Sequence, residues 1–181
     1  MKIKRHLQIV TTLCLMLCSL PVVAQEALVK MSSLPVENMY RIDTDLYRSA
    51  QPTENDFEEL EQFGINEILN LRNYHIDKIN ANSKLLLHWV RMNAHSIKDR
   101  DVIAALKIIK NRRGAMLIHC HRGSDRTGVI CAMYRIVFQN WSKEKAIAEL
   151  KDERLGHHKI YINIINYIKK VDIDEIKAAI K

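Results

Sequence analysis

The sequence is poor in cysteine, with four in 181 residues. Two of these, Cys14 and Cys18, lie in an N-terminal segment that has the pattern of a signal peptide. The remaining two, Cys120 and Cys131, are too few for the disulfide framework of a small secreted domain. The scarcity of cysteine therefore excludes a disulfide-stabilised scaffold, and each remaining thiol must be explained by packing or by reactivity.

Long runs of lysine and arginine are also absent, as are internal repeats and low-complexity segments. The formal net charge is +7, but the basic pairs Arg112-Arg113 and Lys169-Lys170 stand alone in the sequence. Such isolated pairs are more typical of solvated helix ends than of a nucleic-acid surface, so we expect no nucleic-acid partner. The modest excess of positive charge suits a small anionic ligand.

The first 24 residues predict a secretory signal peptide. Basic residues open the chain, an apolar run follows over residues 7–20, and Ala24 ends a plausible cleavage site. The apolar run is too short to span a membrane comfortably, although an uncleaved anchor is the alternative. We therefore expect a periplasmic or secreted protein with no stable membrane insertion after cleavage. A linker is predicted over residues 25–36 and one domain over residues 37–181.

Apolar periodicity and turn residues predict that strands alternate with helices. Strands are expected over residues 40–42, 46–48, 65–71, 86–92 and 115–119. Helices are expected over residues 53–63, 99–113, 127–139, 159–170 and 173–180 and after Ser142, while one short helix is an option within 75–85. This order predicts an α/β fold with a central, mainly parallel sheet flanked by helices, and a helical C-terminal third.

The most informative stretch is residues 118–128, which read IHCHRGSDRTG. A short apolar strand delivers Cys120 to its C-terminal end, and five residues separate Cys120 from Arg126 at the start of a helix. A loop that enters a helix points several backbone N–H groups at one spot, and the helix dipole adds partial positive charge there. Gly123 and Gly128 let this backbone approach a ligand closely. The stretch therefore predicts a binding site for a tetrahedral oxyanion.

The same loop predicts a covalent reaction. Its field stabilises a thiolate at Cys120, which can attack a bound phosphorus atom and form a phosphocysteine that water later hydrolyses. Arg126 carries a planar fork that binds two phosphate oxygens, and Thr127 can donate a hydrogen bond to the departing thiolate. We expect Cys120 and Arg126 to be catalytic. The substrate-binding residues are expected to be His121, Arg122, Gly123, Ser124, Asp125 and Thr127.

This stretch resembles the His-Cys-x5-Arg-Ser/Thr-Gly motif of protein tyrosine and dual-specificity phosphatases, and the resemblance extends over most of residues 38–170. Residues 46–52, LYRSAQP, resemble an atypical dual-specificity subgroup, and residues 132–137 with Trp141-Ser142 resemble bacterial, partly periplasmic members. The resemblance implies a phosphatase domain that needs no metal or organic cofactor. Its substrate is then a phosphorylated protein or a small anionic phosphate ester. One alternative function is the hydrolysis of inositol (pyro)phosphates or other small phosphate esters. The other is phosphate binding without turnover.

The sequence offers several candidates for the general acid. Protonation of the leaving oxygen contributes about 10²–10⁴-fold to such reactions. We predict Asp99 in this role because it lies just before a helix, with Asp101 as the alternative. Asp125, inside the loop, is another candidate, although its charge is expected to order Arg122 or the loop backbone. Family members commonly carry the aspartate further upstream, at a position better matched here by Asn93 or His95.

Other polar residues near these motifs have more than one interpretation. Arg48, Ser49 and Gln51 either support the loop or line the pocket, or they form a capped turn beside a helix. Arg72 lies either at the ligand-binding edge of the sheet or in a surface salt bridge. The histidines at 119, 121, 157 and 158 have the wrong spacing for a structural zinc, so no metal site is expected. Instead, His119 is expected to bond the loop backbone. The sequence does not indicate an oligomeric state.

Overall fold

A computed structural model of the chain describes residues 28–181. The predicted signal peptide lies outside this range, so it and the export that follows from it stay predictions. Within residues 28–181, no helix has the length and apolar character needed to cross a membrane.

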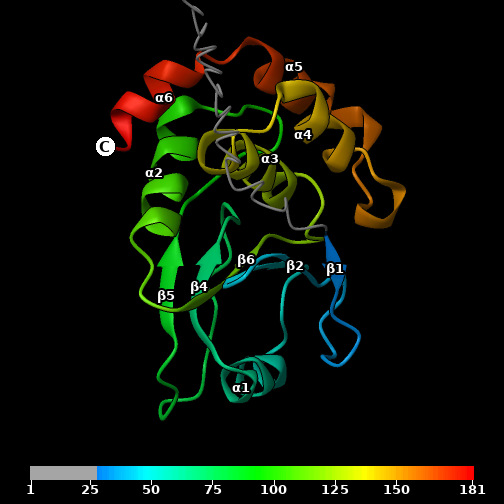
Figure 1. Cartoon of the computed structure of the whole chain (residues 1–181). Helices are drawn as coiled ribbons and strands as arrows, with labels where there is room; N and C mark the ends of the chain where they lie inside the picture. The colour runs from blue at the N-terminus through cyan, green and yellow to red at the C-terminus, as the bar shows by residue number, and fades with distance from the viewer. Residues whose placement is uncertain (1–27) are drawn as a thin grey trace, which may run out of the picture.

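The core of the protein is a six-stranded sheet in the order β1-β2-β3-β6-β4-β5 (Figure 1). Its strands are β1 (Val29–Lys30), β2 (Tyr40–Asp43), β3 (Leu46–Ser49), β4 (Ile65–Asn70), β5 (Leu86–Trp89) and β6 (Ala115–His119). The four strands β3, β6, β4 and β5 are parallel, whereas β1 and β2 extend the sheet in antiparallel pairs. The predicted α/β fold with a mainly parallel sheet is confirmed.

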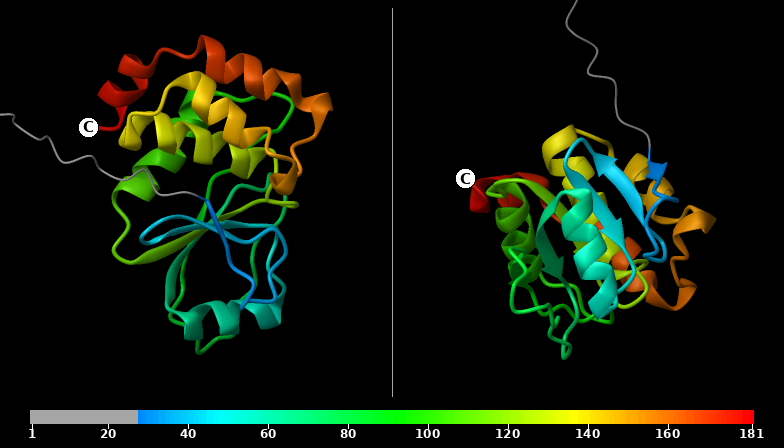
Figure 2. Two further views of the ribbon diagram at one scale, coloured as in Figure 1. Left: turned by 45° about the vertical axis from the view of Figure 1, so that its right-hand side comes forward. Right: turned by 90° about the horizontal axis from the view of Figure 1, so that it is seen from below.

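Helices cover both faces of the sheet (Figures 1 and 2). On one face lies α1 (Glu54–Phe63), which packs over a small apolar core with β4 and β6. The other face carries a larger core beneath α2 (Asp99–Lys110), α3 (Arg126–Gln139), α4 (Lys143–Leu150), α5 (Ile162–Lys170) and α6 (Ile173–Ala179). Two 3-10 turns, η1 (Glu153–Leu155) and η2 (Lys159–Tyr161), link α4 to α5. The C-terminal third is therefore helical, as predicted.

Local chemistry accounts for the helix ends that were predicted well. At the start of α1, the Thr53 side chain accepts from the Asp56 N–H and the Asp56 carboxylate accepts from the Thr53 N–H, which completes a capping box. Gly64 ends the helix in the left-handed conformation, and Ser142 caps α4. These signals lie within a few residues of the ends that they mark, so a sequence pattern can identify them.

Three predicted elements differ from the structure. Residues 75–85 form no helix, because polar groups such as Ser83, which bonds Glu61, anchor this segment to other elements. Strand β5 ends at Trp89, before the predicted Met92, since only Leu86–Trp89 pairs with β4. Finally, Val29–Lys30 pairs with β2 inside the segment predicted as a linker.

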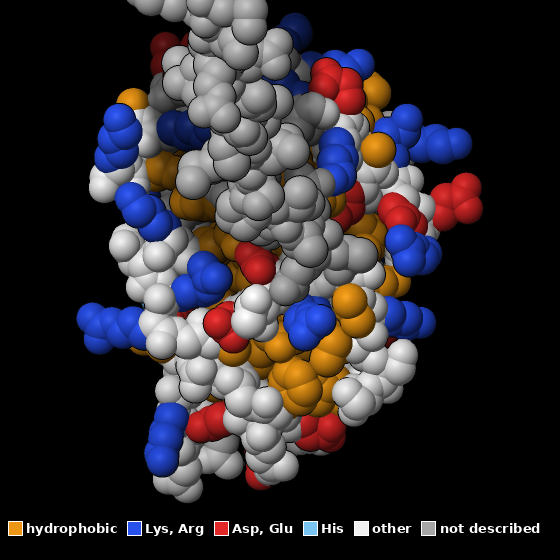
Figure 3. Space-filling model, viewed as in Figure 1, with side chains coloured by type: hydrophobic (Ala, Val, Ile, Leu, Met, Phe, Trp, Pro, Cys, Tyr) orange, Lys and Arg blue, Asp and Glu red, His pale blue; other side chains and the backbone are white. Residues whose placement is uncertain are grey.

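The surface seen in Figure 3 shows lysine and arginine side chains interspersed with acidic ones over this face. No continuous basic stripe is visible there, in keeping with the isolated basic pairs of the sequence.

Candidate active site

The loop that begins with Cys120 follows β6, a strand in the middle of the sheet. Strand β6 pairs in parallel with β3 on one side and β4 on the other, so its C-terminal end opens at the edge where α/β proteins bind ligands. Cys120 follows β6 directly and is only 2% exposed. After five intervening residues Arg126 begins α3, which points its N-terminus at the loop. The structure thus brings Cys120 and the helix dipole together, as the spacing predicted.

Neighbouring strand β3 holds the loop in place. Gly123 has φ of +69°, in the left-handed region, and its backbone lies directly against that of Ser49. A guanidinium nitrogen of Arg48 donates to the Gly123 carbonyl, and Gln51 N–H donates to the His121 carbonyl over 3.1 Å. Arg48 is fully buried, so its charge is committed to supporting the loop. Of the two interpretations of Arg48, the structure shows support for the loop.

A cavity of about 290 Å³ opens above Cys120. It is lined by Cys120, His121, Arg122, Asp125, Arg126, His158, Ile160 and Tyr161. Five of the predicted site residues therefore share one wall. Gly123, Ser124 and Thr127 shape the loop from behind and are buried. The Ser124 hydroxyl, for example, donates to the Arg122 carbonyl over 3.2 Å.

Two side chains near Cys120 have buried hydrogen-bond donors without a partner among the described residues. Within the described residues, Nε of Arg126 and the hydroxyl of Thr127 are buried and have no hydrogen-bond partner. Buried donors are nearly always satisfied, so unpartnered donors at the start of a helix fit a site that receives an anion. This is the arrangement that the Arg126 and Thr127 predictions require.

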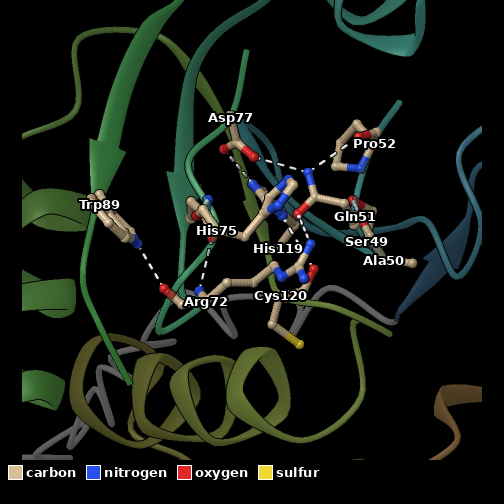
Figure 4. Close-up of polar contacts among 11 residues, drawn as sticks. Ser49, Ala50, Gln51, Pro52, Arg72, His75, Asp77, Trp89, His119 and Cys120 are labelled. Carbon is tan, nitrogen blue, oxygen red and sulfur yellow. Dashed lines mark hydrogen bonds and ion pairs between the residues drawn. The ribbon is translucent and has the colours of Figure 1, made fainter. Parts of the chain in front are cut away.

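A polar network supports the loop from the side of β4 (Figure 4). The His119 ring donates from Nε2 to Asp77 over 2.9 Å, and its Nδ1 lies 3.3 Å from the Cys120 carbonyl oxygen. Gln51 donates to the other oxygen of Asp77 over 2.9 Å and accepts from Arg72 over 3.1 Å. The expected bond from His119 to the loop backbone is confirmed, and Asp77 holds the ring that makes it.

Electrostatics link this network to the cavity. Burial lowers the pKa of Arg72, and the nearby positive charge of Arg126 lowers it further. Burial alone would raise the pKa of Asp77, but hydrogen bonds from His119 and Gln51 outweigh it and hold that pKa below its usual value. Asp77 therefore stays ionised next to Cys120.

Asp77→Asn is expected to destabilise the fold by about 1–3 kcal/mol near neutral pH, because a charged acceptor of two buried donors is lost. Since folding lowers the pKa of Asp77, its stabilisation is present above the unfolded value and is lost as pH falls through the folded one. The difference in the free energy of unfolding between wild type and variant should stay constant down to about pH 4 and narrow below it. Urea unfolding at several pH values measures this.

A matched control is Asp45→Asn, at an exposed aspartate in the turn between β2 and β3. Its unfolding midpoint should stay within experimental scatter of wild type. A stability loss for Asp77→Asn no larger than that of the control, or a gap that widens below pH 4, would show that Asp77 does not hold the loop as an ionised acceptor.

The predicted general acid does not lie on the cavity wall. Asp99 is the first residue of α2, is exposed, and accepts a hydrogen bond from the Tyr167 hydroxyl over 2.8 Å. Asp101 pairs with Arg100, and the His95 ring packs edge-on against Tyr161 with 4.9 Å between ring centroids. None of the three lines the cavity, although His95 contacts a residue that does.

Sequence reasoning did not identify four residues that the structure brings to the site, namely Asp77, His158, Ile160 and Tyr161. Asp77 comes from a segment with no periodic pattern, and His158 and Tyr161 come from the turns before α5. His158 pairs with Asp125, 33 positions away in the chain. Such contacts carry no local signal.

Known proteins with similar sequences are phosphatases. A family model described as "Tyrosine phosphatase family" matches residues 33–180. The chain is 27% identical to dual specificity protein phosphatase TpbA of Pseudomonas aeruginosa over 147 residues, or 80% of this chain and 67% of that protein. It is 30% identical to inositol diphosphatase SIW14 of Saccharomyces cerevisiae over 155 residues, or 80% of this chain and 54% of that protein.

Solved structures agree with these similarities. The crystal structure of TpbA superposes with a TM-score of 0.72 at 25% identity, covering 84% of this chain and 95% of that one. The core catalytic domain of SIW14, in complex with citrate, superposes with a TM-score of 0.69 at 27% identity, covering 80% and 91%. A TpbA variant has also been solved in complex with phosphotyrosine. The similarity spans the sheet, the loop and the helices around it.

Proposed function

The chain belongs to the tyrosine phosphatase family and is a hydrolase of phosphate monoesters, and from this premise we propose that Cys120 is its nucleophile and that phosphotyrosine in proteins is its main substrate. The observation that carries the proposal is the loop itself. A buried thiol lies at the N-terminus of α3, beside an arginine whose Nε has no partner among the described residues. That combination suits a dianionic phosphoryl group.

In the proposed reaction, the Cys120 thiolate attacks phosphorus while backbone N–H groups of the loop and Arg126 bind the other phosphate oxygens. The P–O bond to the leaving group breaks, and a phosphocysteine remains. Water then attacks this intermediate and releases phosphate and the thiolate. The thiolate is a better leaving group when Thr127, buried and otherwise unpartnered in the described chain, donates a hydrogen bond to it.

The outer wall of the cavity supports an aromatic phosphate. Ile160, 74% exposed, and the Tyr161 ring line the mouth above the buried Cys120. An apolar side chain with this much exposure gains by contact with a phenyl ring, whereas a sugar-like ring bearing many phosphates offers it no apolar surface. The TpbA variant bound to phosphotyrosine is consistent with this preference.

A second candidate substrate is an inositol pyrophosphate. Three guanidinium groups, from Arg72, Arg122 and Arg126, lie on or beside the cavity, which is more positive charge than one phosphate requires. The relative SIW14 is an inositol diphosphatase. The two candidate substrates differ in how much apolar contact they make with Ile160 at the mouth of the cavity, and this difference can be measured.

Ile160→Ser should lower kcat/KM for a phosphotyrosyl peptide about fivefold, because roughly 1 kcal/mol of apolar contact with the phenyl ring is removed. Hydrolysis of an inositol pyrophosphate should be unchanged. Ile162→Ser is the matched control, since Ile162 is 56% exposed but lies outside the cavity lining. Equal losses for both variants, or a loss on the inositol substrate alone, would contradict an aromatic-binding mouth.

The function itself is tested by assaying the mature protein against both substrates in EDTA. Turnover of at least one of them without added metal is expected, because thiolate, arginine and loop amides supply the nucleophile and the charge. A protein that binds phosphate but turns over neither substrate would be a binding module instead.

A further inference from the structure

The carboxylate of Asp125 organises a second polar cluster, which shares no residue with the network around Asp77. Its Oδ1 accepts from the His158 backbone N–H over 3.0 Å, and Nδ1 of His157 lies 2.9 Å away from the same oxygen. Its Oδ2 lies 2.8 Å from Nδ1 of His158. The loop that holds Cys120 is thereby fastened to the turn before η2 by one carboxylate.

The partners of His158 determine where its proton lies. Nε2 of His158 is 2.8 Å from a guanidinium nitrogen of Arg122, and a guanidinium can only donate. Nε2 is therefore an acceptor in this structure, while Nδ1 donates to Asp125. A carboxylate at Nδ1 fixes the tautomer and stabilises the ring when Nε2 takes up a proton, which is how aspartate assists histidine in other hydrolases.

His158 lies where a leaving group would emerge. Cys120, at 2% exposure, forms the floor of the cavity, whereas the His158 side chain is 34% exposed and lines the same cavity with Tyr161 and Ile160. In-line attack from the floor directs the departing oxygen towards the mouth. Nε2 of His158 contacts Arg122, another residue of the cavity lining.

Other proton-carrying groups on the wall are poorly suited to the task. Burial would raise the pKa of Asp125, but its bonds to His157 and His158 hold the pKa below the usual value, so this carboxylate is ionised and has no proton to give. Burial and the positive charges of Arg72, Arg122 and Arg126 lower the pKa of His121, which keeps that ring neutral. His158 differs from His121 in having a carboxylate, that of Asp125, beside its Nδ1.

We propose that His158, oriented by Asp125, is the group that protonates the leaving oxygen. In the first step the Cys120 sulfur bonds to phosphorus, the ester P–O bond breaks, and the imidazolium of His158 gives its Nε2 proton to that oxygen. In the second step water attacks the phosphocysteine, the P–S bond breaks to regenerate the thiolate, and Nε2 takes a proton from the water. The proton balance closes over one turnover, and the structure corresponds to the state with Nε2 unprotonated.

Arg122 connects this cycle to substrate binding. Its guanidinium contacts Nε2 of His158 here, yet it also lines the cavity where a phosphate dianion would compete for it. Charge-assisted bonds to phosphate are stronger than a bond to a neutral ring nitrogen, so the guanidinium should turn to the substrate and free Nε2. The groups that face the His158 ring are then Asp125, Arg122 and Tyr161.

His158→Gln should lower kcat/KM for phenyl phosphate by about 10²-fold or more, since its phenolate leaves poorly without a proton. The same variant should lower kcat/KM for p-nitrophenyl phosphate by less than about fivefold, because kcat/KM reports the first step and that leaving group needs little help. Imidazole added to His158→Ala should restore part of the turnover of phenyl phosphate. Thermal unfolding and binding of inorganic phosphate verify that both variants keep the fold and the loop.

Two matched variants distinguish His158 from its rivals. Asp99→Asn and His95→Gln should affect both aryl phosphates equally and weakly, as neither side chain lines the cavity. Uniform losses for His158→Gln, or a leaving-group-selective loss for Asp99→Asn or His95→Gln, would overturn the proposal. The inference rests on the proposed phosphatase function, and the two fail separately. A wild-type protein with no turnover contradicts the function, whereas an active one with a uniform His158→Gln profile contradicts only the role of His158.

Discussion

Cys120→Ser is expected to reduce turnover of p-nitrophenyl phosphate by about 10⁴-fold or more, on the scale seen when other hydrolases lose their nucleophile. Serine has nearly the same size, so the buried position after β6 should be kept and the loop should still bind phosphate. A hydroxyl, however, is not ionised near neutral pH and is the weaker nucleophile. Steady-state kinetics measure the loss, and calorimetric titration with phosphotyrosine should show binding that is unchanged or tighter.

Cys131→Ser provides the control for removing a thiol. Cys131 lies in α3 within the large apolar core, and burial raises its pKa to about 11, so it is a neutral packing residue. The variant should lose stability, by about 1–3 kcal/mol for a buried hydroxyl, and keep its kcat. If Cys120→Ser remained active, or if only Cys131→Ser were inactive while folded, the nucleophile would have been assigned to the wrong cysteine.

The catalytic loop could be predicted because its chemistry is local. Cys120, Arg126 and the glycine between them lie within seven consecutive residues, and each residue type is unusual enough to limit the interpretation. The parallel sheet could be predicted for a similar reason, since short apolar strands alternate with helices at regular intervals. Where the pattern was weak, over residues 75–85, the sequence left a short helix open and the structure has none, because side-chain contacts with distant residues fix that segment.

The supporting residues could not be predicted because their partners lie far away in the chain. Asp77 acts on the loop through His119, 42 positions later, and His158 through Asp125, 33 positions earlier. A sequence pattern reports which face of a helix is apolar, but it does not report which loops meet at a sheet edge. Asp99 had the ordinary chemistry of a loop acid, and only the fold could place it at the start of α2, beside Tyr167 and outside the cavity lining.

Gly123→Ala should lower kcat/KM by about 10²-fold or more, the scale expected when reacting groups move by about 1 Å. The position is in the left-handed region, and an added Cβ would lie 2.4 Å from the Ser49 carbonyl oxygen and 2.7 Å from the Ala50 nitrogen. Both are backbone atoms, at the last residue of β3 and the residue after it, so they cannot turn aside as a side chain could. The loop must instead move away from the backbone of Ser49 and Ala50. This weakens the hydrogen bond from Arg48 to the Gly123 carbonyl and shifts the loop amides that would bind the phosphate.

Gly64→Ala separates backbone strain from the displaced loop. Gly64 also has a positive φ, of +106°, but an added Cβ would have no atom within 4 Å, and the residue ends α1 on the other face of the sheet. We expect a stability loss of about 1 kcal/mol from strain and an unchanged kcat/KM. Gly123→Ala should lose stability as well as activity, because strain and collision act together there. If the two variants showed equal activity, close contact between Gly123 and Ser49 would not be what holds the loop in its binding conformation.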